Sequence, residues 1–411
     1  PTKIKWFAKS SGTTNAKSKF IPVSDDAIEN CHLKAGKDML CLYINNNEET
    51  ALFNGKALRL GGSNAVYEDN NSYFGDLSAI IIENMPFWAD FSSAPSQETA
   101  LMSEWESKME AIINETIHEN ITSLVGVPSW MLVLLNRVLE KTGKKNILEV
   151  WPNLEVYFHG GVNFNPYREQ YRKLIPKKDF KYYETYNASE GFFALQDVNG
   201  SLDLLLMLDY GIFYEFIPMS EYEGEASSAI PLSQVKKEKN YAVVISTNGG
   251  LWRYLIGDTV KFTSLSPYKI RITGRTKHHI NVFGEELIIE NAEEALKLAC
   301  KKTNSTITEY TVGPIFMDGK KQGSHEWVIE FAKAPQNLKY FTELLDNALK
   351  SINSDYEAKR YNNMTLVMPK IHSVKKGLFY SWLKKKGKLG GQHKVPRLSN
   401  KRDFIEELLS L

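Results

Sequence analysis

Apolar residues recur at two different periods along the chain, and each period predicts a class of element. Between Glu98 and Asn120 they fall at three- and four-residue steps, the pattern of a half-buried helix. A second apolar helix is predicted over Ser129–Lys141. Runs of branched and aromatic residues between Gly, Asn or Pro predict strands at Leu154–Phe158, Leu204–Leu208, Ile212–Ile217, Tyr241–Ser246 and Val260–Thr263. This mixture predicts an α/β fold of mixed sheets, without internal repeats.

After Gly274 the pattern changes to that of a smaller α+β unit. Its predicted elements are a helix near Ala292–Lys302, strands near Thr308–Phe316 and Trp327–Phe331, a helix near Leu338–Ile352 and a strand near Met364–Met368. A chain of 411 residues exceeds what one hydrophobic core usually holds. We therefore expect two domains, residues 1–274 and 275–411.

Composition excludes several classes of protein. Fifty basic residues against 49 acidic ones leave a formal charge of +1, so electrostatics do not favour a nucleic-acid partner. Cys31, Cys41 and Cys300 are too few and too scattered for a disulfide framework or a four-ligand zinc site, which fits a reducing compartment. No apolar run approaches the roughly 20 residues that a membrane span needs, and the first residues lack a signal-peptide core. We expect a cytoplasmic protein with no membrane contact and no obligate protein partner.

A polar run near the start has the composition of a phosphate-binding loop. It consists of hydroxyl and glycine residues: Ser10, Ser11, Gly12, Thr13 and Thr14. Glycine allows close approach of the backbone, the hydroxyls donate to phosphate oxygens, and Lys19 adds positive charge. No Gly-Lys-Ser/Thr sequence opens a helix here, so this is not a Walker A loop. Taken alone, the run also fits an ordinary polar surface loop.

The segment FAKSSGTTNAKSKFIPVS resembles the signature loop of the auxin-responsive acyl-acid amido synthetases. They are a branch of the superfamily that contains acyl-CoA synthetases, peptide-synthetase adenylation domains and firefly luciferase. The general loop reads SSGTTGxPK, whereas this chain has Asn15 at the sixth position and carries its lysine one place later, at Lys19, as the amido synthetases do. The resemblance implies the adenylate-forming (luciferase-like) fold, in which a large N-terminal domain is followed by a smaller, mobile α+β domain. It also implies a further N-terminal segment of helices before the loop, which this sequence lacks.

The segment YYETYNASEGFFALQ matches the second nucleotide motif of the superfamily. The matching residues are Tyr186, Asn187, Ser189 and Glu190. The resemblance implies that Tyr186 stacks on adenine and that Glu190 contacts Mg²⁺. One protein carboxylate is enough, because Mg²⁺ usually keeps waters and substrate phosphates as its other ligands.

Upstream of this motif, VYFHGGVNFNPY resembles the strand and glycine turn that lie beside the adenine in the family. Gly160 and Gly161 would let the backbone lie flat against a base. His159 ends an apolar strand, so we interpret it as a core residue and do not assign it a catalytic role.

The segment GLWRYLIGDTV resembles the YRxGD motif and puts Asp258 where the family binds the ribose hydroxyls. An ionised carboxylate suits this role because it can accept two hydrogen bonds. The arginine that usually follows the tyrosine is Leu255 here, while Arg253 precedes Tyr254. Any role of that arginine is therefore not carried over to this chain.

Two segments in the C-terminal third resemble the moving parts of the superfamily. ITGRTKHHINVFGEEL matches the hinge, with Arg275 in the conserved Gly-Arg pair beside the nucleotide and Lys277 at the pivot. GGQHKVPRLSN puts Lys394 in the place of the mobile catalytic lysine. Without the resemblance, this lysine-rich tail would be interpreted as a solvated basic face.

Together, the motifs imply ATP-dependent activation of a carboxylic acid with Mg²⁺. The acid would form an acyl adenylate and pyrophosphate, and an amine, such as an amino acid, would then displace AMP to give an amide. We expect acyl specificity to come from the apolar helix around Trp130, Met131 and Leu134. Two alternatives stay open: an acyl-CoA ligase, and a module that binds nucleotide or acyl ligand without turnover. The sequence does not identify the acid, the amine or the oligomeric state.

Overall fold

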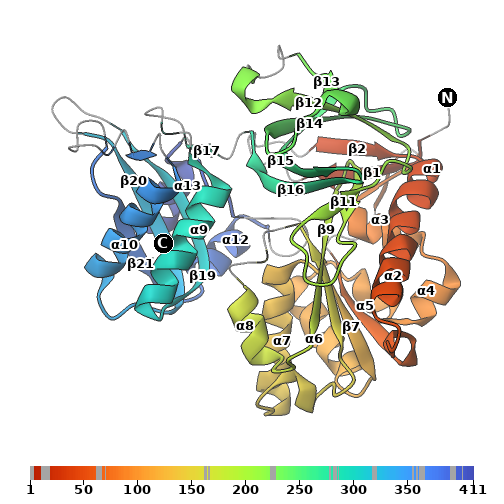
Figure 1. Cartoon of the computed structure of the whole chain (residues 1–411). Helices are drawn as coiled ribbons and strands as arrows, with labels where there is room; N and C mark the ends of the chain where they lie inside the picture. Colours follow the sequence, from red (N-terminus) through yellow and green to blue (C-terminus); the bar gives the residue numbers. More distant parts are fainter. Residues whose placement is uncertain are drawn as a thin grey trace. The chain divides into compact units, whose positions relative to one another are not determined.

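The computed structural model describes residues 4–10, 19–61, 67–69, 71–161, 164, 167–222, 228–276, 279–280, 285, 287–316, 322–353, 356–357, 360, 366–388, 395–399 and 401–411. The chain forms two compact units, shown from red to green and from teal to blue in Figure 1. Unit 1 comprises Pro1–Ile256 and Lys261–Arg271. Unit 2 comprises Ile272–Leu389 and Lys394–Leu411, together with Gly257–Val260.

Parallel strands form the centre of unit 1, in the order β6-β3-β7-β8-β9. Their bounds are β3 (Lys56–Leu60), β6 (Ser93–Ala94), β7 (Ile121–Gly126), β8 (Val156–Gly160) and β9 (Lys181–Ala188). Helices cover both faces: Tyr157 stacks on Tyr171 of α8 (Arg168–Leu174), while Phe158 packs against Tyr43 of α2 (Lys34–Asn46). Because neighbouring residues of a strand point to opposite faces, a strand buried on both sides needs a nearly continuous apolar run. This explains the sequence Val-Tyr-Phe in β8.

The same sheet continues beyond β9 with largely antiparallel strands, in the order β10-β11-β16-β15-β14-β12-β13. They are β10 (Gly191–Leu195), β11 (Leu204–Leu206), β12 (Ile212–Pro218), β13 (Ile230–Pro231), β14 (Asn240–Thr247), β15 (Tyr254–Leu265) and β16 (Tyr268–Arg275). In β12, Tyr214 and Phe216 are buried while Phe213 is exposed, as expected for a sheet with one solvated face.

A second sheet in unit 1 carries the start of the chain. Its order is β2-β1-β5-β4, with bounds β1 (Trp6–Ser10), β2 (Lys19–Val23), β4 (Tyr67–Asp69) and β5 (Ser72–Gly75). Ala8, Ile21 and Val23 of this sheet pack with Ile28 and Ile80 in one apolar cluster. The phosphate-loop candidate therefore joins two strands that are anchored in a core.

Side-chain caps start three of the remaining helices of unit 1, namely α1 (Asp25–Ala27), α5 (Gln97–Ala100) and α6 (Trp105–Thr116). The others are the π-helical turn η1 (Ile28–Leu33), α3 (Leu77–Glu83), α4 (Phe87–Phe91), α7 (Pro128–Thr142) and the 3₁₀ turns η2 (Leu52–Asn54), η3 (Ile147–Glu149), η4 (Met219–Glu221) and η6 (Leu232–Gln234). The helix predicted between Glu98 and Asn120 forms as two pieces. Glu104 accepts a hydrogen bond from the Ser107 amide (2.6 Å) and so starts α6 anew. The predicted helix at Ser129–Lys141 is confirmed as α7, which has proline at its first position.

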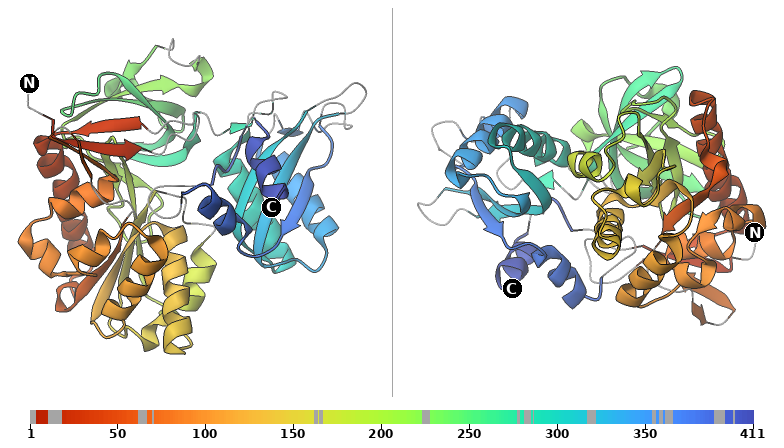
Figure 2. Two further views of the ribbon diagram at one scale, coloured as in Figure 1. Left: turned by 180° about the vertical axis from the view of Figure 1, so that it is seen from behind. Right: turned by 90° about the horizontal axis from the view of Figure 1, so that it is seen from below.

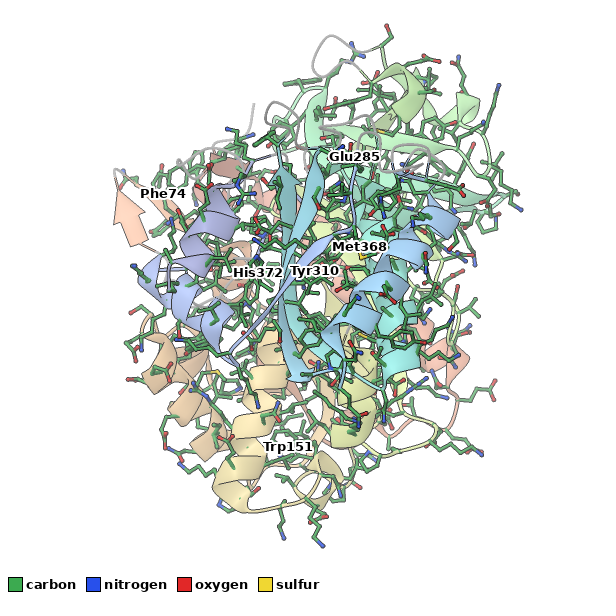
Figure 3. The ribbon with its side chains drawn as sticks, turned by 90° about the vertical axis from the view of Figure 1, so that its left-hand side faces the viewer. Phe74, Trp151, Glu285, Tyr310, Met368 and His372 are labelled. Carbon is green, nitrogen blue, oxygen red and sulfur yellow. The ribbon has the colours of Figure 1, made fainter. Side chains whose placement is uncertain are left out.

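Unit 2 is built on the sheet β19-β20-β21, in which β20 pairs antiparallel with β19 and parallel with β21. Its elements are β17 (His279–Ile280), β18 (Leu287–Ile288), α9 (Ile289–Thr303), β19 (Thr306–Ile315), β20 (Ser324–Lys333), α10 (Leu338–Ile352), β21 (Lys370–Val374), α12 (Leu378–Lys385) and α13 (Asp403–Leu409). The helices α9 and α10 pack on one face, and α12 and α13 lie on the other (Figure 2). Tyr310 and His372 mark the two outer strands in Figure 3.

The predictions for unit 2 are largely confirmed, with one error. The helix α10 has the predicted bounds. The strand predicted at Met364–Met368 is wrong for its described residues, because Leu366 makes a single bridge to Gly323 and the strand forms at Lys370–Val374 instead. No helix in the described part of the chain combines the length and apolarity needed to cross a membrane.

Candidate active site

The parallel strands of unit 1 end side by side at one edge of the sheet. Leu60 of β3 is paired with Gly126 of β7, Gly126 with His159 of β8, and Gly160 with Thr185 of β9. In open α/β sheets, ligands bind at the carboxyl ends of the strands, where the following turns meet. The glycine turn and the second nucleotide motif both lie at this edge.

Gly160 brings these two segments into contact. A Cβ atom on this residue would lie 2.6 Å from the carbonyl oxygen of Thr185 and 3.0 Å from Oδ1 of Asn187. No side chain fits there without moving the backbone of β9. Glycine at position 160 is therefore explained by the approach of the second motif, and Gly161 follows with a left-handed backbone (φ 80°).

The second motif forms the hairpin between β9 and β10. The Tyr186 ring is buried and packs against Phe193, with 4.8 Å between ring centroids. Asn187 is half-buried at the end of β9, and Ser189 and Glu190 form the turn, with Ser189 buried and Glu190 half-buried. The hairpin thus brings amide, hydroxyl and carboxylate oxygens together in four consecutive residues.

A pocket opens beside this turn. It is small and partly open to solvent, and its polar lining includes Cys31, His32, Ser189, Glu190, Thr247 and Asn248. Within the described residues, no group of three or more His, Cys, Asp or Glu side chains could hold a metal ion. A cation here would depend on the Glu190 carboxylate together with substrate oxygens and water, a ligand set that fits Mg²⁺ and not a transition metal.

The strands on either side of the phosphate-loop candidate reach the start of the third motif. Ser10 at the end of β1 pairs with Lys19 at the start of β2, and Ser11–Thr14 lie outside the described residues. The Lys19 ammonium donates a hydrogen bond to the Tyr254 hydroxyl (3.4 Å) and lies 5.5 Å from the centre of its ring. The first and third motifs are therefore neighbours, although 235 positions separate these two residues.

The third motif continues along β15, where Asp258 is half-buried. Arg253, the arginine displaced from its usual place, has a left-handed backbone (φ 46°) and donates from Nε to Oε2 of Glu215 (3.0 Å). Arg275 ends β16, and both Lys277 and Lys394 lie outside the described residues. The roles of these residues stay predictions.

The proposed acyl-binding side chains lie within α7, which starts two residues after β7 ends at Gly126. Trp130, Met131 and Leu134 are buried, and the Trp130 ring packs edge-on against Trp105 at 4.8 Å. Met131 lies near the end of β7, since its Cε would be 3.6 Å from a Cβ added at Gly126. The helix thus begins at the edge where the motifs meet, and the acyl-binding role of the three residues stays a prediction.

Burial controls the electrostatics of the adjoining sheet face. His159 and Glu184 are register partners on β8 and β9. Loss of solvent lowers the pKa of His159 to about 3 and raises that of Glu184 to about 7, and Arg168 opposes the second shift. His159 is therefore neutral at physiological pH, and its ring stacks on Phe164 at 4.2 Å. This environment agrees with its interpretation as a core residue.

Two pocket residues had no signal in the sequence. Cys31 and His32 lie in η1, 157 or more positions before Ser189, and no motif includes them. Burial raises the pKa of the Cys31 thiol to about 11 and lowers that of His32 to about 4. Only the folded structure brings these two uncharged side chains to the pocket.

Three segments of the chain are similar to one family of known proteins. Models of the GH3 family match residues 1–180 (N-terminal domain), 205–275 (central domain) and 290–403 (C-terminal domain). Indole-3-acetic acid-amido synthetase GH3.3 of Arabidopsis thaliana is 24% identical over 64% of this chain and 46% of its own length. Jasmonoyl--L-amino acid synthetase JAR6 of Nicotiana attenuata is 23% identical over 99% of this chain and 81% of its own length. The chain spans about half the length of the first curated relatives that it matches.

Solved structures show the same fold. The AtGH3.15 acyl acid amido synthetase in complex with 2,4-DB matches with a TM-score of 0.81 at 15% identity, over 100% of this chain and 82% of that one. A 2-hydroxyisobutyryl-CoA ligase in the postadenylation state matches with a TM-score of 0.59 at 12% identity, over 99% and 77%. These matches confirm the predicted adenylate-forming α/β fold. Since the three segments of one family occur in order along nearly the whole chain, the protein belongs to the GH3 family.

Proposed function

We propose that this protein is an ATP-dependent acyl-acid amido synthetase, which activates a carboxylic acid as its acyl adenylate and transfers the acyl group to an amine. The observation that carries the proposal is the contact between Gly160 and Asn187, which joins two nucleotide motifs at the carboxyl edge of the parallel strands. Membership of a family whose named relatives are amido synthetases supports the same activity.

In the first half reaction, a carboxylate oxygen of the acid attacks the α-phosphate of ATP and pyrophosphate leaves. The loop at Ser10–Thr14 donates hydrogen bonds to the phosphates, and Lys19 adds a positive charge at its end. Tyr186 stacks on the adenine beside Gly160–Gly161, while Asn187 and Ser189 supply polar contacts. Donors that are already in place lower the cost of building charge on the departing pyrophosphate.

The remaining roles concern the metal, the ribose and the hinge. Bound Mg²⁺ would neutralise phosphate charge, and the Glu190 carboxylate is the group that would hold it. Asp258 accepts hydrogen bonds from the ribose hydroxyls, and Arg275 contacts the nucleotide. Residues 275–411 act as a mobile domain that pivots at Lys277.

Lys394 is the proposed catalytic residue of adenylation. A lysine is a compact cation on a flexible stem, suited to phosphate charge that exists only in this step. In the second half reaction an amine, such as an amino acid, attacks the mixed anhydride and AMP leaves. Trp130, Met131 and Leu134 would select the acid, and three scattered cysteines fit a reducing compartment such as the cytoplasm.

The test is ATP–pyrophosphate exchange over a panel of aromatic and aliphatic carboxylic acids, with a reaction lacking acid as the control. We expect exchange that depends on the acid and on Mg²⁺. Active acids are then incubated with ATP and either amino acids or CoA, and products are identified by mass spectrometry. An amide product supports the proposal, a CoA thioester would show an acyl-CoA ligase instead, and nucleotide binding without exchange would leave only a binding module.

A further inference from the structure

The π-helical turn η1 makes an unusual contact with the hairpin that carries the second motif. Cys31 is 2% exposed, and its Sγ accepts a hydrogen bond from the Phe192 amide (3.2 Å) and donates one to the Phe192 carbonyl (3.8 Å). Single π-helical turns are rare and occur frequently at functional sites. One side chain therefore holds both backbone groups of a residue that lies two positions after Glu190.

Phe192 lies beside an irregularity in β10. Phe192 is paired with Asn187 of β9, whereas Ala194 is paired with Tyr186, so β10 has one extra residue at a β-bulge. The register with β11 begins only at Ala194. On this side of β10 the Cys31 thiol, and not β11, bonds both backbone groups of Phe192. Because burial raises the thiol pKa to about 11, the sulfur keeps the proton that it donates.

The segment around η1 also contacts the turn on the opposite side of the pocket. Asp26 of α1 accepts hydrogen bonds from the side-chain amides of Asn248, in the β14–β15 turn, and Asn30. His32 lines the pocket together with Glu190, and its Nδ1 has no hydrogen-bond partner among the residues that the structure describes. Residues 26–32 thus connect the turn that carries Glu190 to the turn that leads into the third motif.

We propose that Cys31 is a positioning residue for Glu190: it holds the backbone of Phe192 and so fixes the Ser189–Glu190 turn that would bind the Mg²⁺-nucleotide. The inference rests on the proposed function. Removing a group that orients a metal-binding carboxylate commonly lowers the metal affinity about tenfold or more, although the group does not touch the metal.

Three variants test this role. Cys31→Ala removes both hydrogen bonds, and Cys31→Ser keeps a donor and an acceptor on a shorter side chain. Cys300→Ala is the matched control, since Cys300 is a half-buried thiol whose pKa burial likewise raises to about 11, but it lies in α9 of unit 2. All three are compared with the parent protein for thermal stability, for hydrogen exchange of the Phe192 amide and for the kinetics of ATP–pyrophosphate exchange.

For Cys31→Ala we expect faster exchange of the Phe192 amide, an increase of about tenfold in the Mg²⁺ concentration for half-maximal activity, and an unchanged KM for the acid. Calorimetry should show weaker binding of Mg²⁺-ATP. Cys31→Ser should recover part of the loss, and Cys300→Ala should match the parent protein in every measurement except thermal stability.

Two outcomes would overturn the inference while leaving the proposed function intact: parental Mg²⁺ dependence in Cys31→Ala, or an equal shift in Cys300→Ala. If Cys31→Ala does not fold, Cys31→Ser decides by the same criteria. If the parent protein shows no acid-dependent exchange, the proposed function fails. Calorimetry then decides the inference, and equal Mg²⁺-ATP affinity in the parent protein and Cys31→Ala would overturn it.

Discussion

Replacing Glu326 by glutamine should destabilise unit 2 in a way that depends on pH. Glu326 is a buried carboxylate on β20 that accepts hydrogen bonds from His372 (2.7 Å) and Arg402 (2.6 Å), with the Lys370 ammonium 3.0 Å away. Burial alone would raise its pKa. The three partners together outweigh burial and lower the pKa from 4.5 to about 2.

The lowered pKa of Glu326 gives the size and the sign of the expected change in stability. A change from 4.5 to about 2 corresponds to about 3 kcal/mol of stability, an upper value because Lys370 is mostly exposed. The folded pKa lies below the unfolded one, so this stability is fully present above about pH 4.5 and is lost as the pH falls toward 2. Glu326→Gln should therefore lower the free energy of unfolding by up to about 3 kcal/mol at pH 7, and by progressively less below pH 4.5.

The assay must report on unit 2 by itself. Pulse-labelling hydrogen exchange across a urea series, read from peptides of β19, β20 and β21, does so at pH 7 and pH 3. The control is Glu407→Gln, which removes a half-exposed carboxylate paired with Lys386 (2.7 Å) and should cost at most about 1 kcal/mol. The reasoning is refuted if Glu326→Gln loses no more stability than this control at pH 7, or loses the same amount at both pH values.

Four further predictions concern the proposed site. Asp258→Ala should weaken ATP binding about tenfold or more, since charge-assisted hydrogen bonds contribute about 1.5–3 kcal/mol each; unchanged affinity by calorimetry would remove Asp258 from the site. Glu190→Gln should reduce ATP–pyrophosphate exchange while the melting temperature barely moves, because the amide keeps the shape and loses the charge; parental exchange at saturating Mg²⁺ would contradict the metal role. Lys394→Ala should lose adenylation but still form amide from a pre-made acyl adenylate, and equal loss in both assays would argue against a lysine that acts in one step only. Gly160→Ala should reduce both stability and nucleotide affinity because its methyl group would displace Thr185; parental values in thermal unfolding and calorimetry would show that the contact is not tight.

Elements with strong local signals were predicted well from the sequence. The bounds of α10 follow from its apolar periodicity and from Asn337, whose side chain accepts a hydrogen bond from the Tyr340 amide (3.0 Å). The missed strand β21 shows the limit of this approach. Ile371 of β21 is the register partner of Trp327 on β20, whereas His372 is hydrogen-bonded to the Glu326 carboxylate. The sequence of β21 therefore lacks the apolar run that would predict a strand. The strand is defined by its parallel pairing with β20, which only the tertiary structure creates.

The candidate site also has a part that could be predicted from the sequence and a part that could not. The motif residues could be found by resemblance, because they lie in short continuous segments such as Gly160–Gly161 and Ser189–Glu190. The role of Cys31 could not be predicted, because a single cysteine that lies 161 positions before Phe192 carries no local signal. Its partner lies beside a β-bulge, which is a property of how β9 and β10 pair and not of the composition of either strand.

The pairing of β8 with β9 also determines where the protein can be divided. The N-terminal family segment ends at residue 180, one residue before β9 begins, although β9 is the parallel neighbour of β8. A fragment that stops at residue 180 would leave the apolar strand Val156–Gly160 as an open edge, with unpaired amides and carbonyls ready to add another chain. The boundary is therefore one of sequence similarity and not of independent folding. Expression of this region as a separate piece would favour insoluble association over a native fragment, and chain breaks are better tolerated outside the central sheet.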